Sequence, residues 1–314
     1  MFTVLFTSAG RRVELIQAFR QSLQNQSVNT RIIATDLNPG LASACHFADA
    51  AYPLPKCNED NYLKILIDIC IHEQVDLLIP LYEPEFAFLN QSRHEFEIRK
   101  TNLLLSNRHT LETCRDKWLT HQFFLNNGIK TPLSWTGDTL PKQGQLPLFA
   151  KPRKGMGSIG IKKIISPEQL LLQRTPEILL QEFISGREYT LDILSDLSGK
   201  VISVVPRERL EVRSGEVSKS RTVKRDDLIK DGKEIVETLG AIGPVTLQCI
   251  DTGQDVYWIE INPRFGGGVP LSIAAGVDYP YLLYRMCTRQ PVQPIIGQFK
   301  DNLTMLRYDQ AVYF

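Results

Sequence analysis

The sequence lacks the features that mark membrane-spanning, disulfide-bonded or nucleic-acid-binding proteins. No apolar run approaches the ~20 residues of a membrane-spanning helix. The six cysteines are scattered without a Cys-x-x-Cys pair, so we expect reduced thiols and neither a disulfide framework nor a zinc site. A formal net charge of +1 with 23% charged residues calls for neither nucleic acid nor a membrane as a partner. We therefore expect a cytoplasmic protein, long enough at 314 residues for two or three domains.

The first hundred residues alternate between strand-like and helix-like patterns. Strands are expected at 3–7, 31–35, 77–80 and 102–106, and helices at 12–24, 60–72 and 84–92. Such alternation predicts βαβ units and a parallel sheet. Farther along, helical patterns cover 107–127 and 226–239, and the segments between and after them are mainly strand-like.

The first expected strand ends in Ser8-Ala9-Gly10-Arg11-Arg12, where parallel folds bind anions at the start of a helix. This stretch has one glycine instead of the G-x-G-x-x-G of a dehydrogenase, so Asp36 only mimics the ribose-binding acid of a dinucleotide site. Arg11 is a candidate ligand for a substrate carboxylate or phosphate, and a solvated residue at a helix start is the alternative. Glu83, just past the third strand, is a similar candidate.

The segment Trp258–Arg264 carries the most chemical information. Glu260, Asn262 and Arg264 occupy alternate positions, so in a strand they project to one face, while Ile259 and Ile261 are expected to face the core. Carboxylate and amide oxygens suit Mg²⁺, and a guanidinium suits phosphate. The pattern predicts a metal–nucleotide site, with an ordinary strand end bearing a surface ion pair as the alternative.

A second strand-like segment, 245–250, is joined to this one by the turn residues Asp251-Thr252-Gly253-Gln254-Asp255. We expect a β-hairpin that brings Gln248 beside Glu260. Two ligands on one hairpin can hold the metal ions that bridge nucleotide phosphates.

Gln248 followed by Glu260-Ile261-Asn262-Pro263-Arg264 resembles the metal-binding hairpin of ATP-grasp enzymes. Many members have Asp or Glu at the first position, and the glutamine here is similar to the synthetase units of the carbamoyl phosphate synthase large subunit. The strand 148–152 leads into a basic, glycine-rich loop, 153–160, which resembles the phosphate-covering loop of that family. Lys151 stands at the position of its nucleotide-binding lysine.

The resemblance implies an ATP site in which lysines hold the phosphates, 181–184 the adenine and Glu188 the ribose. Its candidate residues are Lys117, Lys151, Gly155, Gly157, Ser158, Gln181, Glu182, Phe183, Ile184 and Glu188. The implied metal ligands are Gln248, Glu260 and Asn262, with one or two Mg²⁺ ions and Mn²⁺ as an alternative. Arg264 is the implied catalytic residue, stabilising charge on the transferred phosphoryl group.

Two further segments supply candidate substrate contacts. Gly266 and Gly267 follow the expected strand that carries Glu260 and Asn262, and their backbone N–H groups can stabilise developing negative charge. A purely structural glycine turn is the alternative. The basic run from Arg207 to Arg221 has no paired aromatics for nucleic acid and is expected to be mostly solvated. Within it, Lys219 and Arg221 are candidates to reach phosphates or an anionic substrate.

Together these features predict an α/β fold that becomes α+β in its C-terminal part. We expect a Rossmann-like parallel sheet (1–108), then a two-subdomain ATP-grasp fold whose small part carries the glycine-rich lid (109–184) and whose large part carries the metal site (185–314).

The resemblance implies an ATP-dependent ligase for small molecules. A carboxylate attacks ATP, an acyl phosphate and ADP form, and an amine or a thiol displaces phosphate. Two alternatives remain. One is a carbamoyl-phosphate-synthase-like unit that acts on bicarbonate or carbamate, and the other is a nucleotide-binding module without turnover. The substrates, the pathway, a homodimeric state and a partner subunit that supplies ammonia stay open.

Overall fold

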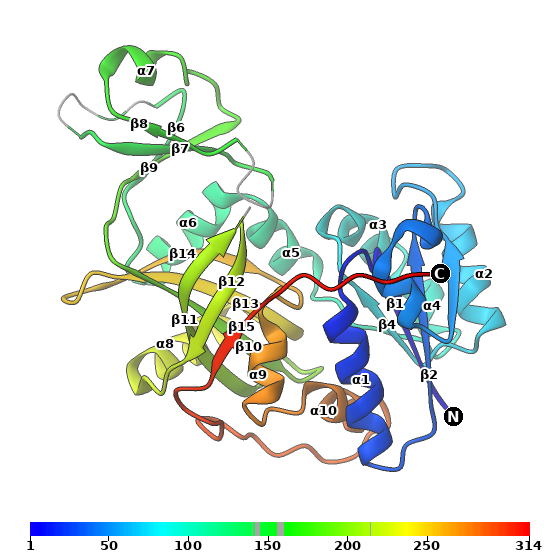
Figure 1. The fold of residues 1–314 in the computed structure, drawn as a ribbon. Helices are drawn as coiled ribbons and strands as arrows, with labels where there is room; N and C mark the ends of the chain where they lie inside the picture. Colours follow the sequence, from blue (N-terminus) through cyan, green and yellow to red (C-terminus); the bar gives the residue numbers. More distant parts are fainter. Residues whose placement is uncertain (140, 142–144, 156–159, 214) are drawn as a thin grey trace.

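The computed structural model describes residues 1–139, 141, 145–155, 160–213 and 215–314, which form three sheets (Figure 1). The first sheet is parallel. In spatial order its strands are β3 (Ala50–Pro53), β2 (Thr30–Asp36), β1 (Phe2–Thr7), β4 (Leu77–Pro80) and β5 (Asn102–Leu103). Because β1 pairs with both β2 and β4, the loops after β1 and β4 meet at the carboxyl edge, the usual ligand-binding edge of such sheets.

Helices cover both faces of this sheet because successive strand residues point to opposite sides. Val4 and Phe6 pack against α1 (Val13–Asn25), whereas Leu5 packs against α2 (Tyr62–His72) and α3 (Phe86–Gln91). The remaining short helices of this part are α4 (Arg93–Glu97), η1 (Pro39–Leu41), η2 (Ser43–Phe47) and η3 (Glu83–Glu85).

The second sheet is antiparallel and has six strands. In spatial order they are β14 (Val256–Asn262), β13 (Gly243–Asp251), β10 (Arg187–Ser195), β11 (Val201–Arg213), β12 (Glu216–Thr222) and β15 (Thr304–Leu306). Helix α8 (Asp226–Leu239) packs on one face. Helices α9 (Val269–Ala274) and α10 (Tyr279–Cys287) pack on the other face, where they also meet α1 (Figure 1). One continuous core therefore joins the first two sheets.

The third sheet is small and antiparallel, and stands apart from the other two in Figure 1. Its strands are β6 (Ser134–Thr136), β9 (Ile178–Glu182), β7 (Leu148–Pro152) and β8 (Lys162–Ile164), accompanied by helix α7 (Pro167–Leu171). It has a core of its own around Leu148 and Leu180. The three sheets confirm the predicted fold class, and the boundaries predicted at 108/109 and 184/185 stay predictions.

The helical pattern predicted over 107–127 forms two helices. Helices α5 (Arg108–Arg115) and α6 (Lys117–Asn126) are separated by Asp116, whose side chain accepts a hydrogen bond from the Trp118 N–H at 2.9 Å and caps α6. Cys114 and Phe124 from these helices are buried against the six-stranded sheet. Both helices therefore pack on the large sheet although their residues precede the small one.

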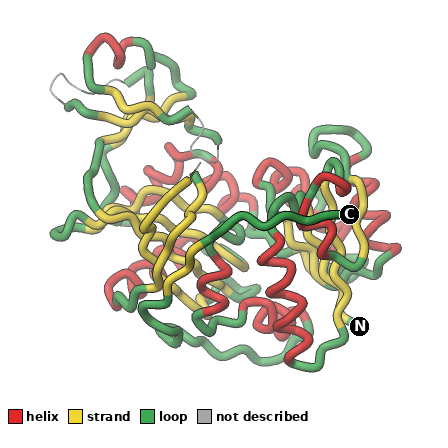
Figure 2. The backbone as a smooth tube through the Cα atoms, in the orientation of Figure 1, coloured by secondary structure: helices red, strands yellow, loops and turns green. Residues whose placement is uncertain are grey.

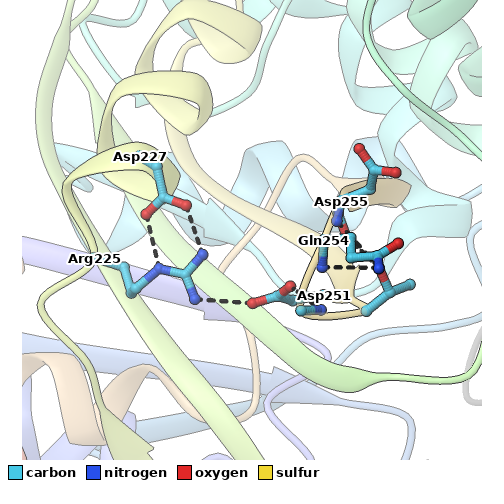
Figure 3. Close-up of polar contacts among 7 residues, drawn as sticks. Arg225, Asp227, Asp251, Gln254 and Asp255 are labelled. Carbon is cyan, nitrogen blue, oxygen red and sulfur yellow. Dashed lines mark hydrogen bonds and ion pairs between the residues drawn. The ribbon is translucent and has the colours of Figure 1, made fainter.

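The β13–β14 hairpin is anchored to the start of α8. Arg225 donates to Asp227 at 2.8 Å and to Asp251 at 2.9 Å, and so bridges the helix and the end of β13 (Figure 3). Within the turn, the Thr252 N–H donates to the Asp255 carbonyl at 3.0 Å. These contacts hold in place the hairpin that carries Gln248 and Glu260.

After β15 the chain continues as a long loop that crosses from the large sheet toward the parallel sheet, where the C-terminus lies (Figure 2). Phe314 stacks there on His46, with ring centroids 4.1 Å apart. All six cysteines are free, as expected. No helix in the described part of the chain is long and apolar enough to cross a membrane.

Candidate active site

Two adjoining pockets meet at the middle of the β13–β14 ladder. The lysine pocket, of about 200 Å³, is lined by Lys117, Pro132, Phe149, Lys151, Pro152, Gly155, Ile161, Gln181, Glu182, Ile184, Glu188, Arg209, Gln248, Ile250, Ile259 and Glu260. The arginine pocket, of about 500 Å³, is lined by residues 8–12, Leu81, Tyr82, Arg207, Arg209, residues 215–217, Thr246, Gln248, Glu260, Asn262, Arg264, residues 266–268 and Arg307. Arg209, Gln248 and Glu260 line both.

The hairpin places the metal-ligand candidates as predicted, with one change of register. Gln248 pairs directly with Glu260, but the next residue of β13 pairs with Trp258, so Ile259 is an extra residue in a β-bulge. Trp258 and Ile261 are consequently buried in the core, whereas Ile259 lines the lysine pocket. The prediction that Ile259 faces the core is wrong because the bulge breaks the two-residue alternation.

The oxygen ligands available where the two pockets meet are suited to a metal cation bound together with a nucleotide. Gln248, Glu260 and Asn262 all line the arginine pocket, and Glu260 makes no side-chain hydrogen bond or ion pair within the described residues. Among the described residues, no group of three His, Cys, Asp or Glu side chains is arranged so that it could hold a metal ion. One carboxylate and two amide oxygens would neutralise only half of the charge of a divalent ion. Such a set suits Mg²⁺ when phosphate oxygens supply its remaining ligands and charge.

Where the two pockets meet, Arg264 is held by Asn262 of β14 and by Glu83 of η3. Its Nε donates to Glu83 Oε1 at 2.9 Å, and its Nη2 donates to Asn262 Oδ1 at 3.4 Å. Burial raises the pKa of Glu83, while the charge of Arg264 acts in the opposite direction. Glu83 follows β4 of the parallel sheet, so the site is assembled across the interface of the first two sheets.

Lys151 is buried in the lysine pocket, with 9% of its surface exposed. Its Nζ donates to Gln181 Oε1 at 2.7 Å, and Gln181 in turn donates to Ser134 Oγ at 3.0 Å. Burial lowers the pKa of Lys151 to about 8, although nearby Glu260 raises it. The buried ammonium group of Lys151 donates to one neutral acceptor, the amide oxygen of Gln181. A bound phosphate would therefore stabilise this charge through a charge-assisted hydrogen bond.

Lys117 reaches the same pocket from the first turn of α6. Its Nζ donates to the Gly155 carbonyl at 2.8 Å, and its own N–H donates to the Arg153 carbonyl at 2.9 Å. Arg153 also forms an ion pair with Asp116 at 2.7 Å. These contacts tie the start of α6 to the end of β7, which brings the two predicted ATP lysines into one pocket.

Most of the remaining predicted ATP ligands also line the lysine pocket. Glu182 accepts from the Leu133 N–H at 3.2 Å, and Glu188 pairs with Arg209 at 3.2 Å. Phe183 does not line it and lies instead between Phe149, 5.2 Å away by ring centroids, and Lys163. Gly157, Ser158 and most of the predicted lid, 154–159, lie outside the described residues.

Sequence reasoning missed Arg207 and Arg209, which were expected among mostly solvated residues. Arg207 is 2% exposed and pairs with Asp192 at 2.9 Å. Both arginines line the arginine pocket because they alternate on β11 and so share one face of a central strand. The signal available in the sequence was a pair of arginines two positions apart, directly after the mainly apolar segment 201–206.

The predicted substrate contacts divide into two groups. Gly266, Gly267 and Arg11 line the arginine pocket, with Arg11 largely exposed and 3.5 Å from Asp309. Lys219 pairs with Glu211 at 2.7 Å and Arg221 pairs with Glu208 at 2.8 Å, and neither lines a pocket described above. The structure therefore does not bring Lys219 and Arg221 to the site.

Two domain models match the chain: a PylC-like N-terminal domain over residues 4–104 and an ATP-grasp domain over residues 114–268. The chain belongs to the ATP-grasp superfamily. The second match contains the lysine pocket and the whole β13–β14 hairpin, which confirms the resemblance inferred from Gln248 and residues 260–264.

Relatives of this ATP-grasp protein include ligases and synthases. The 3-methyl-D-ornithine–L-lysine ligase of Methanosarcina acetivorans is 25% identical over 278 residues, which cover 86% of this chain and 70% of that protein. The carbamoyl phosphate synthase large chain of Agathobacter rectalis is 20% identical over 261 residues, 73% of this chain and 24% of that protein.

The fold is similar to a solved biotin carboxylase domain. This is the domain dimer of the Hydrogenobacter thermophilus 2-oxoglutarate carboxylase, determined with MgADP and bicarbonate. The match has a TM-score of 0.74 and 18% identity, and covers 97% of this chain and 73% of that chain. This likeness supports the ATP-grasp architecture.

Proposed function

We propose that this protein is a Mg²⁺-dependent, ADP-forming ligase that joins a carboxylate to an amine through an acyl phosphate. The observation that carries the proposal is the sharing of Gln248 and Glu260 by the lysine and arginine pockets. Nucleotide phosphates held by the lysines and an acid held in the arginine pocket would meet at these two side chains. Phosphoryl transfer needs this convergence of donor, acceptor and charge-neutralising groups.

The residues of the lysine pocket would bind and orient ATP. Lys117 and Lys151 would hold the phosphates, Glu188 the ribose, and the backbone of residues 182–184 the adenine edge. Loss of water from around the buried Lys151 strengthens its attraction for phosphate oxygens.

The residues where the two pockets meet would neutralise negative charge on the transferred phosphoryl group. Gln248, Glu260 and Asn262 would hold a Mg²⁺ ion, which would neutralise charge on the phosphate oxygens. Arg264, fixed by Glu83, would face the transferred phosphoryl group without moving. The N–H groups of Gly266 and Gly267 would stabilise negative charge on the acyl group.

The size of the arginine pocket is compatible with organic substrates. A cavity of about 500 Å³ is far larger than an ion of four heavy atoms requires, and it falls within the range of small-molecule sites. The ligase from Methanosarcina acetivorans joins two amine-bearing acids by its name, which supports an amine as the nucleophile here. A thiol nucleophile is the remaining option for the second step.

A screen of carboxylate and amine pools for ADP release tests the proposal. ADP and phosphate should appear only when ATP, Mg²⁺ and a suitable acid are present, and the amine should convert the acid to an amide. AMP and pyrophosphate as products would rule out an acyl phosphate. ATP binding without ADP release from any pool would favour the module without turnover.

A further inference from the structure

Within the described residues, the arginine pocket contains one arginine that forms no ion pair. Six arginines line it: Arg11, Arg12, Arg207, Arg209, Arg264 and Arg307. All except Arg12 form ion pairs, and their partners are, in the same order, Asp309, Asp192, Glu188, Glu83 and Glu216. Arg12 forms none within the described residues, and none of the nine residues outside them is acidic.

The surroundings of Arg12 leave its guanidinium in need of an anion. The side chain is half-buried, and Arg264 and Arg307 both repel its charge. Glu216 attracts it but forms its ion pair with Arg307, at 3.2 Å. Burial and the neighbouring cations lower the pKa of Arg12 to about 10, so the group remains charged at neutral pH.

Gly267 makes room for this guanidinium. A Cβ atom placed on Gly267 would lie 3.2 Å from Arg12 Nη1, closer than ordinary contact. Arg12 therefore lies directly against the backbone after the metal strand, in the same pocket as Arg264. A ligand bound to Arg12 would therefore lie in the same pocket as Glu260, at a position set by the backbone around Gly267.

We propose that Arg12, with Arg307 beside it, binds a carboxylate or phosphate group of a substrate other than the group that ATP activates. The inference rests on the proposed ligase function, since it concerns the substrate of the same site. Arg264 is hydrogen-bonded to Glu83 and Asn262, next to the proposed position of the transferred phosphoryl group. The carboxylate that ATP activates would therefore bind beside Arg264. Arg12 then selects a second anionic group, either on a polyanionic acid or on an amine such as an amino acid.

Anion binding to the whole chain tests the subsite without knowledge of the substrate. Succinate and inorganic phosphate are the probes, succinamide is the uncharged match, and sodium chloride keeps ionic strength constant. The melting temperature should rise with both anions in the wild type and in Arg20→Gln, which removes an equal charge outside the pocket, from the helix that follows Arg12. Arg12→Gln should abolish the rise, and Arg12→Lys should restore part of it.

Two outcomes would overturn the inference: a wild type unaffected by either anion, or a rise that persists in Arg12→Gln. A rise lost in Lys151→Met and retained in Arg12→Gln would assign the anion to the lysine pocket, which also overturns the inference. Mg²⁺-ATP should still raise the melting temperature of Arg12→Gln, which also shows that this variant is folded. Failure of Mg²⁺-ATP to stabilise the wild type would instead count against the proposed function.

Kinetics with the substrates found by the ADP-release screen identify the source of the anion. Arg12→Gln should raise the KM of one substrate about 10- to 100-fold, as expected for one lost charge-assisted contact, with a smaller change in kcat. A raised KM for the acid indicates a polyanionic acid, and a raised KM for the amine indicates an anionic amine. Unchanged KM values for both would contradict the subsite.

Discussion

Gln248 and Glu260 are directly paired across the β13–β14 ladder and line both pockets of the site. One of the pair is neutral and the other is charged, although both offer oxygen ligands. With Asn262 also neutral, Glu260 supplies all the formal negative charge of the candidate metal ligands. Binding of Mg²⁺ should therefore depend unequally on the two facing residues.

Replacing Glu260 by glutamine should abolish Mg²⁺-dependent turnover while preserving the fold, because the two side chains are nearly isosteric. Loss of ~3 kcal/mol of transition-state stabilisation would lower the rate at least a hundredfold. Initial rates of ADP release over a Mg²⁺ titration measure the effect. Glu211→Gln, an exposed substitution on β11, is the matched control. Near-normal rates in Glu260→Gln would place the metal elsewhere.

Replacing Gln248 by glutamate should have opposite effects with and without the metal. Mg²⁺ would gain a second carboxylate, so the concentration that gives half-maximal activity should fall several-fold. Without Mg²⁺, two carboxylates directly opposite each other repel, so the melting temperature should fall. Thermal unfolding with and without Mg²⁺-ATP shows both changes. A variant whose melting temperature and Mg²⁺ requirement both match the wild type would indicate that Gln248 does not face the ion.

The sequence predicted the hairpin of the candidate site, where polar residues alternate along a strand. Alternation of Glu260 and Asn262, together with the turn after Asp251, was sufficient to place Gln248 opposite Glu260. The bulge at Ile259 could not be predicted because it comes from the pairing partner of each residue, which local alternation does not specify.

Residues whose roles depend on contacts distant in sequence escaped prediction. Arg207 appeared to belong to a solvated basic run, but its partner Asp192 lies on the neighbouring strand β10. Of the adjacent arginines at the start of α1, Arg11 was selected and Arg12 was overlooked. They differ only in their surroundings in space: Arg11 is largely exposed and pairs with Asp309, whereas Arg12 is half-buried against Gly267.

Replacing Gly268 by alanine should destabilise the protein. The added Cβ would lie 2.5 Å from Arg207 Cζ, and that guanidinium cannot swing away because it is buried and bonded to Asp192. Overpacking of this kind costs about 1–3 kcal/mol. Thermal and urea unfolding should show a clear loss of stability. Gly40→Ala, whose Cβ would meet only Asn38 Oδ1 at 3.5 Å, should be close to neutral. Equal stability of the two variants would show that Arg207 can move.

Binding of Mg²⁺-ATP should weaken as pH rises above 8, because burial lowers the pKa of Lys151 to about 8. The charged amine binds phosphate, so below pH 8 the free protein already carries the required proton. Above pH 8 the free protein has lost that proton and must regain it on binding, which lowers affinity by up to tenfold per pH unit. The nucleotide phosphates are fully ionised throughout this range and contribute no opposing change.

Calorimetry at pH 7 and pH 9 tests this pH dependence, in buffers of different ionisation enthalpy that reveal the proton taken up at pH 9. Lys151→Met should bind Mg²⁺-ATP weakly at both pH values and take up no proton. Lys117→Met should also bind weakly but should keep the decline toward pH 9, since Lys151 is intact in that variant. A decline that survives in Lys151→Met would mean that another group carries the titration and that the buried lysine does not contact phosphate.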